Sequence, residues 1–174
     1  MHHGKFGKLL NKKFWKGKNV LVTGHTGFKG TWISQLLIEL GANVSGLSLL
    51  EAPSKPCLYD LLGLDKTLVD LRGDITSLKT CNKAVNNSNP DILIHMAAQP
   101  LVRLSYQQPI LTYNTNIMGT VNILEAVRNL DSIKAILVVT SDKCYNNTDN
   151  GKSFNEASML GGDDPYSSSK ACAE

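Results

Sequence analysis

One glycine-rich segment, residues 22–32 (VTGHTGFKGTW), constrains the fold of this chain more than any other part. Its three glycines repeat with the spacing G-x-x-G-x-x-G, and a short apolar, β-branched run at residues 19–23 leads into it. After it, apolar side chains recur at helical spacing until Gly41, a typical helix C-terminal signal. The order strand, glycine turn, helix is the context in which such a pattern predicts a dinucleotide-binding unit.

Each glycine has a separate expected role in that unit. Gly24 permits the tight turn after the strand, Gly27 lets the backbone approach a pyrophosphate, and Gly30 lets the helix pack closely on the strand. The helix N-terminus adds unpaired N–H groups and a partial positive charge. A strand-to-helix turn without a ligand is the alternative, so the rest of the chain has to distinguish the two.

Beyond this unit the chain alternates between extended and helical patterns. Further strands are predicted at residues 43–49, 67–70, 91–96 and 135–140, and helices at 77–85, 113–130 and from 165 onward. This alternation predicts an α/β fold, a Rossmann-type doubly wound parallel sheet. The fifth strand is apolar throughout, which is typical of a strand covered on both faces.

Composition narrows the class of protein. The 174 residues suffice for one domain with a sizeable core, and 42% hydrophobic and 19% charged residues are ordinary for a globular protein. Six lysines and no acidic residue lie in residues 1–18, so the remaining chain has twelve basic and fifteen acidic residues. We therefore expect a flexible basic leader at 1–18 and a dinucleotide-binding domain at 19–174, without a basic face for nucleic acid.

The sequence also argues against a membrane protein and against a metal site. No apolar run reaches the roughly 18–20 residues of a membrane span, and no apolar signal segment follows the basic start. Four scattered cysteines form no C-x-x-C pair, which argues against a zinc site or a disulfide framework. The expected location is the reducing cytoplasm.

A second constellation indicates chemistry. Ser141 follows the fifth predicted strand, and Tyr166 and Lys170 are four residues apart on the last predicted helix, hence on one face. An ammonium near a phenol favours the phenolate and makes tyrosine a usable base. A serine at the end of a parallel strand lies in the crevice where open α/β sheets bind ligands. An exposed helix face is the alternative for the Tyr–Lys pair alone.

Taken together, these blocks resemble the extended short-chain dehydrogenases/reductases, in the branch of NAD-dependent sugar-nucleotide epimerases and dehydratases. The shared blocks are TGHTGFKG (23–30), HMAA (95–98), NIMGT (116–120) and Tyr166-x-x-x-Lys170. Longer stretches, GHTGFKG-[ST]-W, AAQPLVR, SDKCY and DPYSSSKACAE, resemble the CDP-glucose 4,6-dehydratase family from about residue 14 to the last residue. Thr31 stands where that family commonly has serine.

The resemblance implies NAD as cofactor, CDP-glucose as substrate and a net dehydration to the 4-keto-6-deoxy sugar. It implies that Tyr166 takes the C4 hydroxyl proton, that Ser141 orients this oxygen, and that Lys170 holds the cofactor ribose. It also implies that Asp142 protonates the departing C6 hydroxyl and that Lys143 acts at C5.

The resemblance further implies a homodimer, a role in deoxysugar biosynthesis for lipopolysaccharide O-antigen, and a fuller residue set. Its cofactor-binding residues are Gly24, Thr26, Gly27, Phe28, Gly30, Asp74, Ile75, Ala97, Ala98, Asn116, Tyr166 and Lys170, and its substrate-binding residues are Gln99 and Arg103. No metal ligands are implied.

Two questions stay open at this point. The second strand ends in Ser48 and Leu49, without the acid that binds a ribose 2′-hydroxyl, so the residues alone do not choose between NAD and NADP. The substrate-binding part that the resemblance implies is expected beyond residue 174, so the chain reads as the N-terminal part of an enzyme, inactive alone. The alternatives are a non-catalytic dinucleotide-binding remnant and another sugar-nucleotide dehydratase or epimerase. Lys143 speaks against a dTDP-glucose enzyme, where glutamate is expected.

Overall fold

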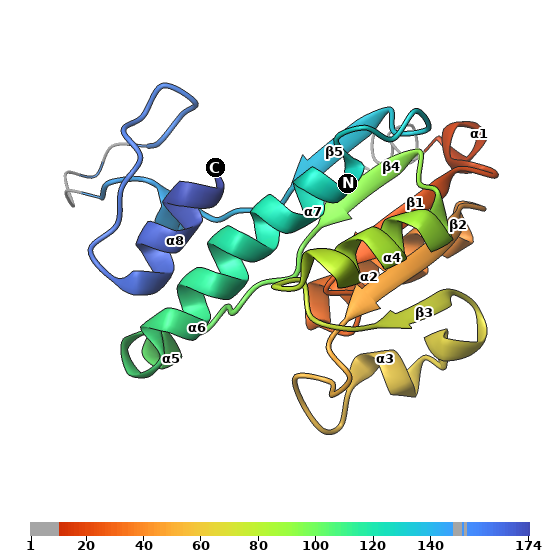
Figure 1. Cartoon of the computed structure of the whole chain (residues 1–174), viewed down its shortest axis with the longest axis horizontal. Helices are drawn as coiled ribbons and strands as arrows, with labels where there is room; N and C mark the ends of the chain where they lie inside the picture. The colour runs from red at the N-terminus through yellow and green to blue at the C-terminus, as the bar shows by residue number, and fades with distance from the viewer. Residues whose placement is uncertain (1–10, 148–150, 152) are drawn as a thin grey trace, which may run out of the picture.

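The computed structural model describes residues 11–147, 151 and 153–174 and contains one parallel five-stranded sheet (Figure 1). The strand order is β3-β2-β1-β4-β5. Strands β2 and β3 are added on one side of β1, and β4 and β5 on the other, so the order of the strands switches between β1 and β4. The strands are β1 (Asn19–Thr23), β2 (Asn43–Ser48), β3 (Val69–Arg72), β4 (Ile92–His95) and β5 (Ala135–Val138). This architecture confirms the predicted Rossmann-type fold.

Helices cover both faces of this sheet (Figure 1). Helices α2 (Phe28–Glu39) and α3 (Leu58–Leu61) pack on one face, where Leu37 and Tyr59 join the core residues of β1 and β2. Helices α4 (Leu78–Ser88) and α7 (Gly119–Val127) pack on the other. The remaining helical segments are α1 (Lys12–Trp15), η2 (Leu64–Lys66), α5 (Val102–Gln107), α6 (Pro109–Tyr113), η3 (Asn114–Met118), η4 (Asp142–Cys144) and α8 (Pro165–Ala173).

The predicted bounds hold for most elements and shift for two. β3 begins two residues later than expected, because its pairing with β2 runs from Val69 opposite Ser45 to Arg72 opposite Ser48. The long helix predicted at 113–130 starts already at Pro109 and is interrupted by the π-helical turn η3. Proline fits the first turn of a helix because its missing N–H has no intrahelical partner there.

Strand β5 is not covered on both faces among the described residues, although its apolar pattern is typical of such a strand. It pairs with β4 alone among the described strands, and Ile136 and Leu137 are 44% and 54% exposed. Its apolar composition therefore does not correspond to burial within the described residues.

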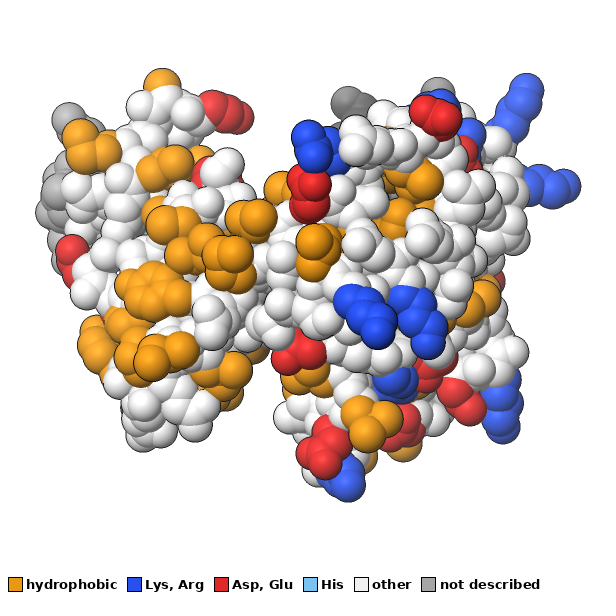
Figure 2. Space-filling view, viewed as in Figure 1, with side chains coloured by type: hydrophobic (Ala, Val, Ile, Leu, Met, Phe, Trp, Pro, Cys, Tyr) orange, Lys and Arg blue, Asp and Glu red, His pale blue; other side chains and the backbone are white. Residues whose placement is uncertain are grey.

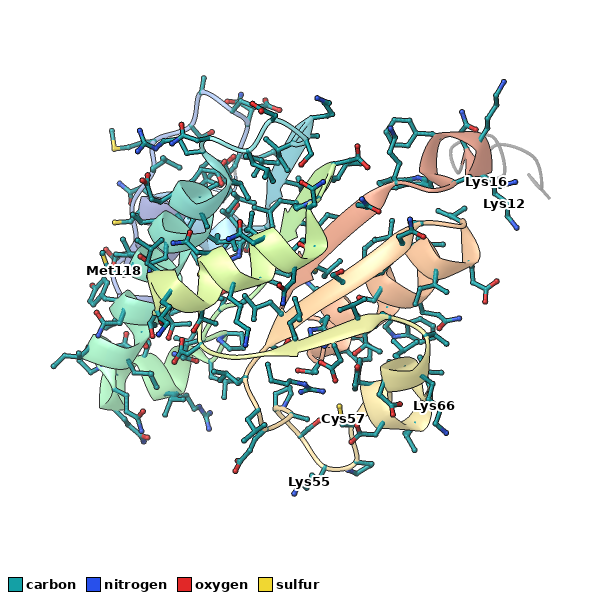
Figure 3. All side chains as sticks on the ribbon, turned by 45° about the vertical axis from the view of Figure 1, so that its right-hand side comes forward. Lys12, Lys16, Lys55, Cys57, Lys66 and Met118 are labelled. Carbon is teal, nitrogen blue, oxygen red and sulfur yellow. The ribbon has the colours of Figure 1, made fainter. Side chains whose placement is uncertain are left out.

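The predicted basic leader falls partly outside the described residues, which begin at residue 11. From there, Asn11 caps the short helix α1, and Trp15 packs against the core cluster on the α2 face. On the connection from β2 to α3, Lys55 points outward, whereas Cys57 is buried and lies 3.5 Å from the Thr26 carbonyl oxygen (Figure 3). Within the described part of the chain, no helix has the length and apolar character to cross a membrane.

Candidate active site

The glycine turn lies at the carboxyl end of β1, against the end of β4. Gly24 has φ of 77°, and a Cβ there would lie 2.8 Å from the backbone nitrogen of Ala97. Only glycine fits both that conformation and that distance. The turn and the segment after β4 are thus in direct backbone contact.

The other two glycines meet different surroundings. Gly27 is the N-cap of α2 without a side-chain cap, and a Cβ there would meet only the Gly24 carbonyl oxygen, at 3.2 Å. At Gly30 the same added atom would lie 2.0 Å from that oxygen. Gly30 is therefore required for packing, while Gly27 leaves an open backbone at a helix N-terminus, which fits an anion such as a pyrophosphate.

The end of β4 is held by a buried hydrogen-bond network around Thr23. Its Oγ1 accepts hydrogen bonds from the backbone N–H groups of Met96 and Ala97, both at 3.1 Å. The same oxygen lies 2.6 Å from Nδ1 of His95. With both amides donating to it, the Thr23 hydroxyl donates its own proton to Nδ1.

This assignment fixes the state of His95. Its Nε2 lies 3.0 Å from Thr120 Oγ1, which itself donates to the Asn116 carbonyl oxygen at 2.6 Å, so Nε2 carries the proton. Burial lowers the pKa of His95 to about 4, with the charge of Lys170 acting in the same direction. His95 is therefore a neutral connector between the last residue of β1 and α7.

Asn116, in the π-helical turn η3, continues the network towards α8. Its Oδ1 accepts from the Gln99 backbone N–H at 2.8 Å, and its Nδ2 donates to Ser169 Oγ at 2.8 Å. The Gln99 side chain is buried and donates to Thr112 Oγ1 at 2.9 Å and accepts from the Leu101 N–H. Gln99 thus shapes its own loop, and direct contact of Gln99 with substrate stays a prediction.

Helix α8 carries the predicted tyrosine and lysine and places the lysine beside the segment that follows β5. Asp164 caps it by accepting from the Ser167 N–H at 3.0 Å, and α8 packs against η4, η3, α6 and α5. The Lys170 side chain is buried, and its Nζ donates to the Val139 carbonyl oxygen at 3.2 Å, directly after β5. Burial lowers the pKa of Lys170, and the nearby charge of Lys29 adds to this effect. The Tyr166 side chain is partly exposed.

The segment after β5 presents the other three predicted catalytic side chains. Ser141 is the N-cap of η4, and its Oγ accepts from the Lys143 N–H at 2.9 Å. Its own O–H is not used in that bond. Asp142 and Lys143 are exposed on η4. Because η4 packs on α8, the structure brings all five predicted catalytic residues to two adjoining elements.

The remaining predicted residues lie in the glycine turn and at the start of α2, in the segment after β3, and on α5. Thr26 is buried, Phe28 is 73% exposed at the start of α2, and Asp74 caps its own turn by accepting from the Thr76 N–H. Ile75 is buried against Gly119, whose added Cβ would lie 2.5 Å from it. Arg103 is exposed on α5, away from the glycine turn in sequence and connected to the site through the packing of α5 on α8.

A second buried histidine was not assigned a role by the sequence. His25, inside the glycine turn, lies 2.9 Å from Ser48 Oγ and 3.0 Å from Asp70 Oδ1. Asp70 in turn holds Arg72 through Nε at 2.7 Å. A histidine in a glycine turn is visible in the sequence, but its partner is 45 positions away, so no local pattern indicates the pair.

The arrangement suits binding of a phosphorylated cofactor and acid–base chemistry. Among the described residues, no three His, Cys, Asp or Glu side chains are grouped to hold a metal ion. The uncapped N-terminus of α2 follows the carboxyl end of β1, and the buried Lys170 and Ser141 lie at the segment that follows the carboxyl end of β5. Together they can hold a phosphorylated cofactor and move a proton at a neighbouring hydroxyl.

Comparison with known proteins gives the family. Residues 21–174 match the family described as GDP-mannose 4,6 dehydratase. The chain is 49% identical over 166 residues to a CDP-glucose 4,6-dehydratase from Salmonella typhimurium, covering 95% of this chain and 46% of that protein. It is 30% identical to a probable dTDP-glucose 4,6-dehydratase from Sinorhizobium fredii, covering 89% and 47%.

Solved structures agree with this match. A UDP-glucose 4-epimerase from Thermus thermophilus, crystallised in complex with NAD, superposes with a TM-score of 0.76 at 28% identity, over 88% of this chain and 48% of that one. The chain spans about half the length of the curated relatives it matches. By sequence and by fold, this chain belongs to the GDP-mannose 4,6 dehydratase family.

Proposed function

We propose that this chain forms the NAD-binding half and the catalytic core of a CDP-glucose 4,6-dehydratase, which converts CDP-glucose to CDP-4-keto-6-deoxyglucose and water. The observation that supports it most is that the glycine turn follows the carboxyl end of β1 and that Lys170 of α8 reaches the residue after the carboxyl end of β5, in the same parallel sheet. Lys170 reaches the Val139 carbonyl, and Val139 N–H donates to His95, whose strand contacts the turn. The choice of CDP-glucose rests on the 49% identity over 95% of the chain.

NAD is the proposed cofactor. The residues fit it, because α2 has an uncapped N-terminus and Gly27 leaves the backbone there accessible. Solved relatives crystallised with NAD support the same assignment. When bound, NAD supplies reversible hydride acceptance, so the overall reaction needs no external oxidant or reductant.

Two side chains act at the C4 hydroxyl of the sugar in this proposal, and Lys170 supports them. Tyr166 takes the hydroxyl proton, and the Ser141 O–H donates to the same oxygen, since its lone pair already accepts from Lys143. Lys170 spends one of its three N–H donors on Val139, which leaves the others for the cofactor ribose and for stabilising the phenolate of Tyr166.

Elimination of water uses the exposed side chains of η4. The ketone at C4 makes the C5 hydrogen acidic, Lys143 assists its removal, and Asp142 protonates the departing C6 hydroxyl so that it leaves as water. Exclusion of water around the bound sugar is part of the mechanism, because it strengthens the electrostatic interactions between these side chains and the sugar. Arg103 and Gln99 remain the proposed substrate contacts.

The wider setting is proposed on the same resemblance: a cytoplasmic homodimer in deoxysugar biosynthesis for lipopolysaccharide O-antigen. The dimer is supported by an apolar surface on the face shown in Figure 2. It includes Ile110, Met118 and Val121, which are 76%, 48% and 49% exposed along α6, η3 and α7. Met118 is directed outward from this helical run (Figure 3).

The test uses the protein expressed from the complete reading frame, with CDP-glucose and no added reductant. We expect formation of the 4-keto-6-deoxy product. Tyr166→Phe should lower kcat by about 10²–10⁴-fold while NAD affinity stays within about threefold, because only the base is removed. Asp142→Asn should stall after oxidation, with build-up of reduced nicotinamide absorbance.

Tyr106→Phe, on exposed α5, is the matched control and should keep normal turnover. If Tyr166→Phe retained full dehydratase activity, the catalytic assignment would be wrong. Conversion of UDP-glucose to UDP-galactose without any 4-keto product would instead identify an epimerase.

A further inference from the structure

The carboxyl end of β2 has no acidic residue, although this position normally contacts the cofactor ribose. In dinucleotide folds an Asp or Glu here binds the ribose 2′-hydroxyl, and a nearby Arg accommodates a 2′-phosphate. In this chain the position is Ser48, which is buried. Its Oγ lies 2.9 Å from His25 Nδ1 and accepts from the Thr26 N–H at 3.3 Å. Ser48 is therefore fully engaged inside the protein.

A cation lies beside this strand end instead. Arg72, the last residue of β3, is the direct strand partner of Ser48. Its Nη1 donates to the carbonyl oxygen of Leu49 at 3.1 Å, so the guanidinium reaches across the end of β2. The Tyr59 ring supports it, with the guanidinium carbon 5.3 Å from the ring centre. At 26% side-chain exposure, Arg72 is still accessible to a ligand.

Asp70 neutralises that cation. Two parallel contacts join them, Arg72 Nε to Oδ1 at 2.7 Å and Nη2 to Oδ2 at 2.7 Å. Oδ1 also accepts from His25 Nε2 at 3.0 Å. Burial alone would raise the pKa of Asp70, but the hydrogen bond and charge of Arg72 hold it below its usual value. Burial lowers the pKa of His25 against the opposing pull of Asp70.

The cluster is therefore neutral overall at neutral pH. Asp70 is ionised, Arg72 is protonated and His25 is uncharged. A phosphate monoester has a charge of roughly −1.5 to −2 and needs net positive charge nearby. A bidentate Arg–carboxylate pair offers N–H donors to a hydroxyl but adds a carboxylate that repels a phosphate.

We propose that the Asp70–Arg72 ion pair sets cofactor choice, favouring a dinucleotide with a free ribose 2′-hydroxyl over one with a 2′-phosphate. The inference rests on the proposed dinucleotide-binding function, and it answers the question that the sequence left open. Asp70 acts as the specificity residue by occupying Arg72, which would otherwise be a phosphate ligand. The acid that selects NAD is thus Asp70 of β3, which acts through Arg72, and not a residue of β2.

The test measures binding, not turnover. Nucleotide-free protein from the complete reading frame is titrated calorimetrically with NAD⁺, NADP⁺ and 2′,5′-ADP. We expect wild type to prefer NAD⁺. Asp70→Asn, which keeps a hydrogen-bond acceptor for His25, should raise affinity for NADP⁺ and 2′,5′-ADP by about tenfold or more and leave NAD⁺ within about threefold. The gain should weaken as salt is added.

Arg72→Gln provides the second, independent measurement. With Asp70 left unpaired, the ratio of NADP⁺ to NAD⁺ affinity should fall below that of wild type, and Asp70→Asn combined with Arg72→Gln should lose the NADP⁺ gain. Glu125→Gln is the matched control, because it frees Arg128 from an ion pair on the exposed face of α7 and should change neither affinity.

The outcomes separate the two proposals. Wild type that binds NADP⁺ more tightly than NAD⁺, or an affinity ratio unchanged in both Asp70→Asn and Arg72→Gln, overturns the specificity inference while NAD binding stands. Failure of wild type to bind any of the three probes overturns the proposed dinucleotide-binding function itself. If Asp70→Asn does not fold, as judged by circular dichroism, the affinity ratio of Arg72→Gln decides alone.

Discussion

The two buried histidines perform related tasks at neighbouring strand ends. Each accepts a hydrogen bond at Nδ1 from the hydroxyl of a strand-end residue, Thr23 for His95 and Ser48 for His25. Each then uses Nε2 to reach a partner far away in sequence, Thr120 or Asp70. Because burial penalises the charged imidazolium, both stay neutral and serve as connectors between elements.

This has a consequence for stability against pH. The pKa of His95 is about 4 in the folded protein, against about 6.5 in an unfolded chain. Between those values the unfolded state binds a proton that the folded state does not. Stability therefore falls as pH falls from about 6.5 to about 4, by up to roughly 3 kcal/mol from this residue. The lowered pKa of His25 contributes with the same sign.

The measurement is the free energy of unfolding from urea titrations at pH 7 and pH 4.5. His95→Gln, which can also accept at one atom and donate at another, should show a smaller loss between the two pH values than wild type. An equal loss in both proteins would mean that His95 does not titrate as inferred.

At the scale of elements, the unit formed by β1, the glycine turn and α2 divides its glycines between packing and binding. Gly30 faces the Gly24 carbonyl at a distance that no Cβ tolerates, whereas Gly27 has room on its outer side. Gly30 is thus needed for the packing of α2, and Gly27 keeps the proposed phosphate site accessible. The two roles can be separated by substitution.

We expect Gly30→Ala to destabilise the protein by about 2 kcal/mol or more, because the added methyl forces α2 away from the turn. Gly27→Val should cost far less stability yet reduce NAD affinity by about 100-fold or more, because its side chain blocks the approach to the helix N-terminus. Thermal melting and NAD titration of both variants check this. If the Gly27→Val protein bound NAD with wild-type affinity, the assignment of the phosphate site to this turn would be wrong.

At the scale of the whole molecule, one helical run joins two regions. Helices α6, η3 and α7 extend from the sheet to the lobe that contains α5 and α8 (Figure 1). Asn116, in the π-helical turn of this run, bonds both the loop after β4 and Ser169 of α8. The position of Tyr166 and Lys170 relative to the sheet is thereby tied to the same run whose outer face is apolar.

The proposed dimer makes that outer face testable. Val121→Glu should convert the protein from the complete reading frame to a monomer, raising the dimer dissociation constant by about 100-fold, because a charge is placed in the centre of an apolar contact. Leu61→Glu, on the exposed side of α3, is the control and should leave the mass unchanged. Light scattering after gel filtration measures the mass directly. If Val121→Glu formed a dimer with the wild-type dissociation constant, the interface would lie elsewhere.

The sequence by itself determined whatever depends on neighbours along the chain. The glycine turn, the strand before it and the helix after it were predictable, because turn chemistry and hydrophobic period are local properties. The same holds for the placement of Tyr166 and Lys170 four residues apart on helix α8. The family resemblance implies roles for these residues, and those roles stay predictions.

Tertiary structure decided what depends on residues distant in sequence. The bounds of β3 follow from its register against β2, and the exposure of β5 follows from its place at the edge of the described sheet. The Gln99 side chain turns inward, where its amide donates to Thr112 Oγ1, 13 residues away in sequence. The Asp70 carboxylate contacts His25, which is 45 residues away in sequence. No local pattern encodes this contact, because β3 brings Asp70 to His25 only once the sheet has formed.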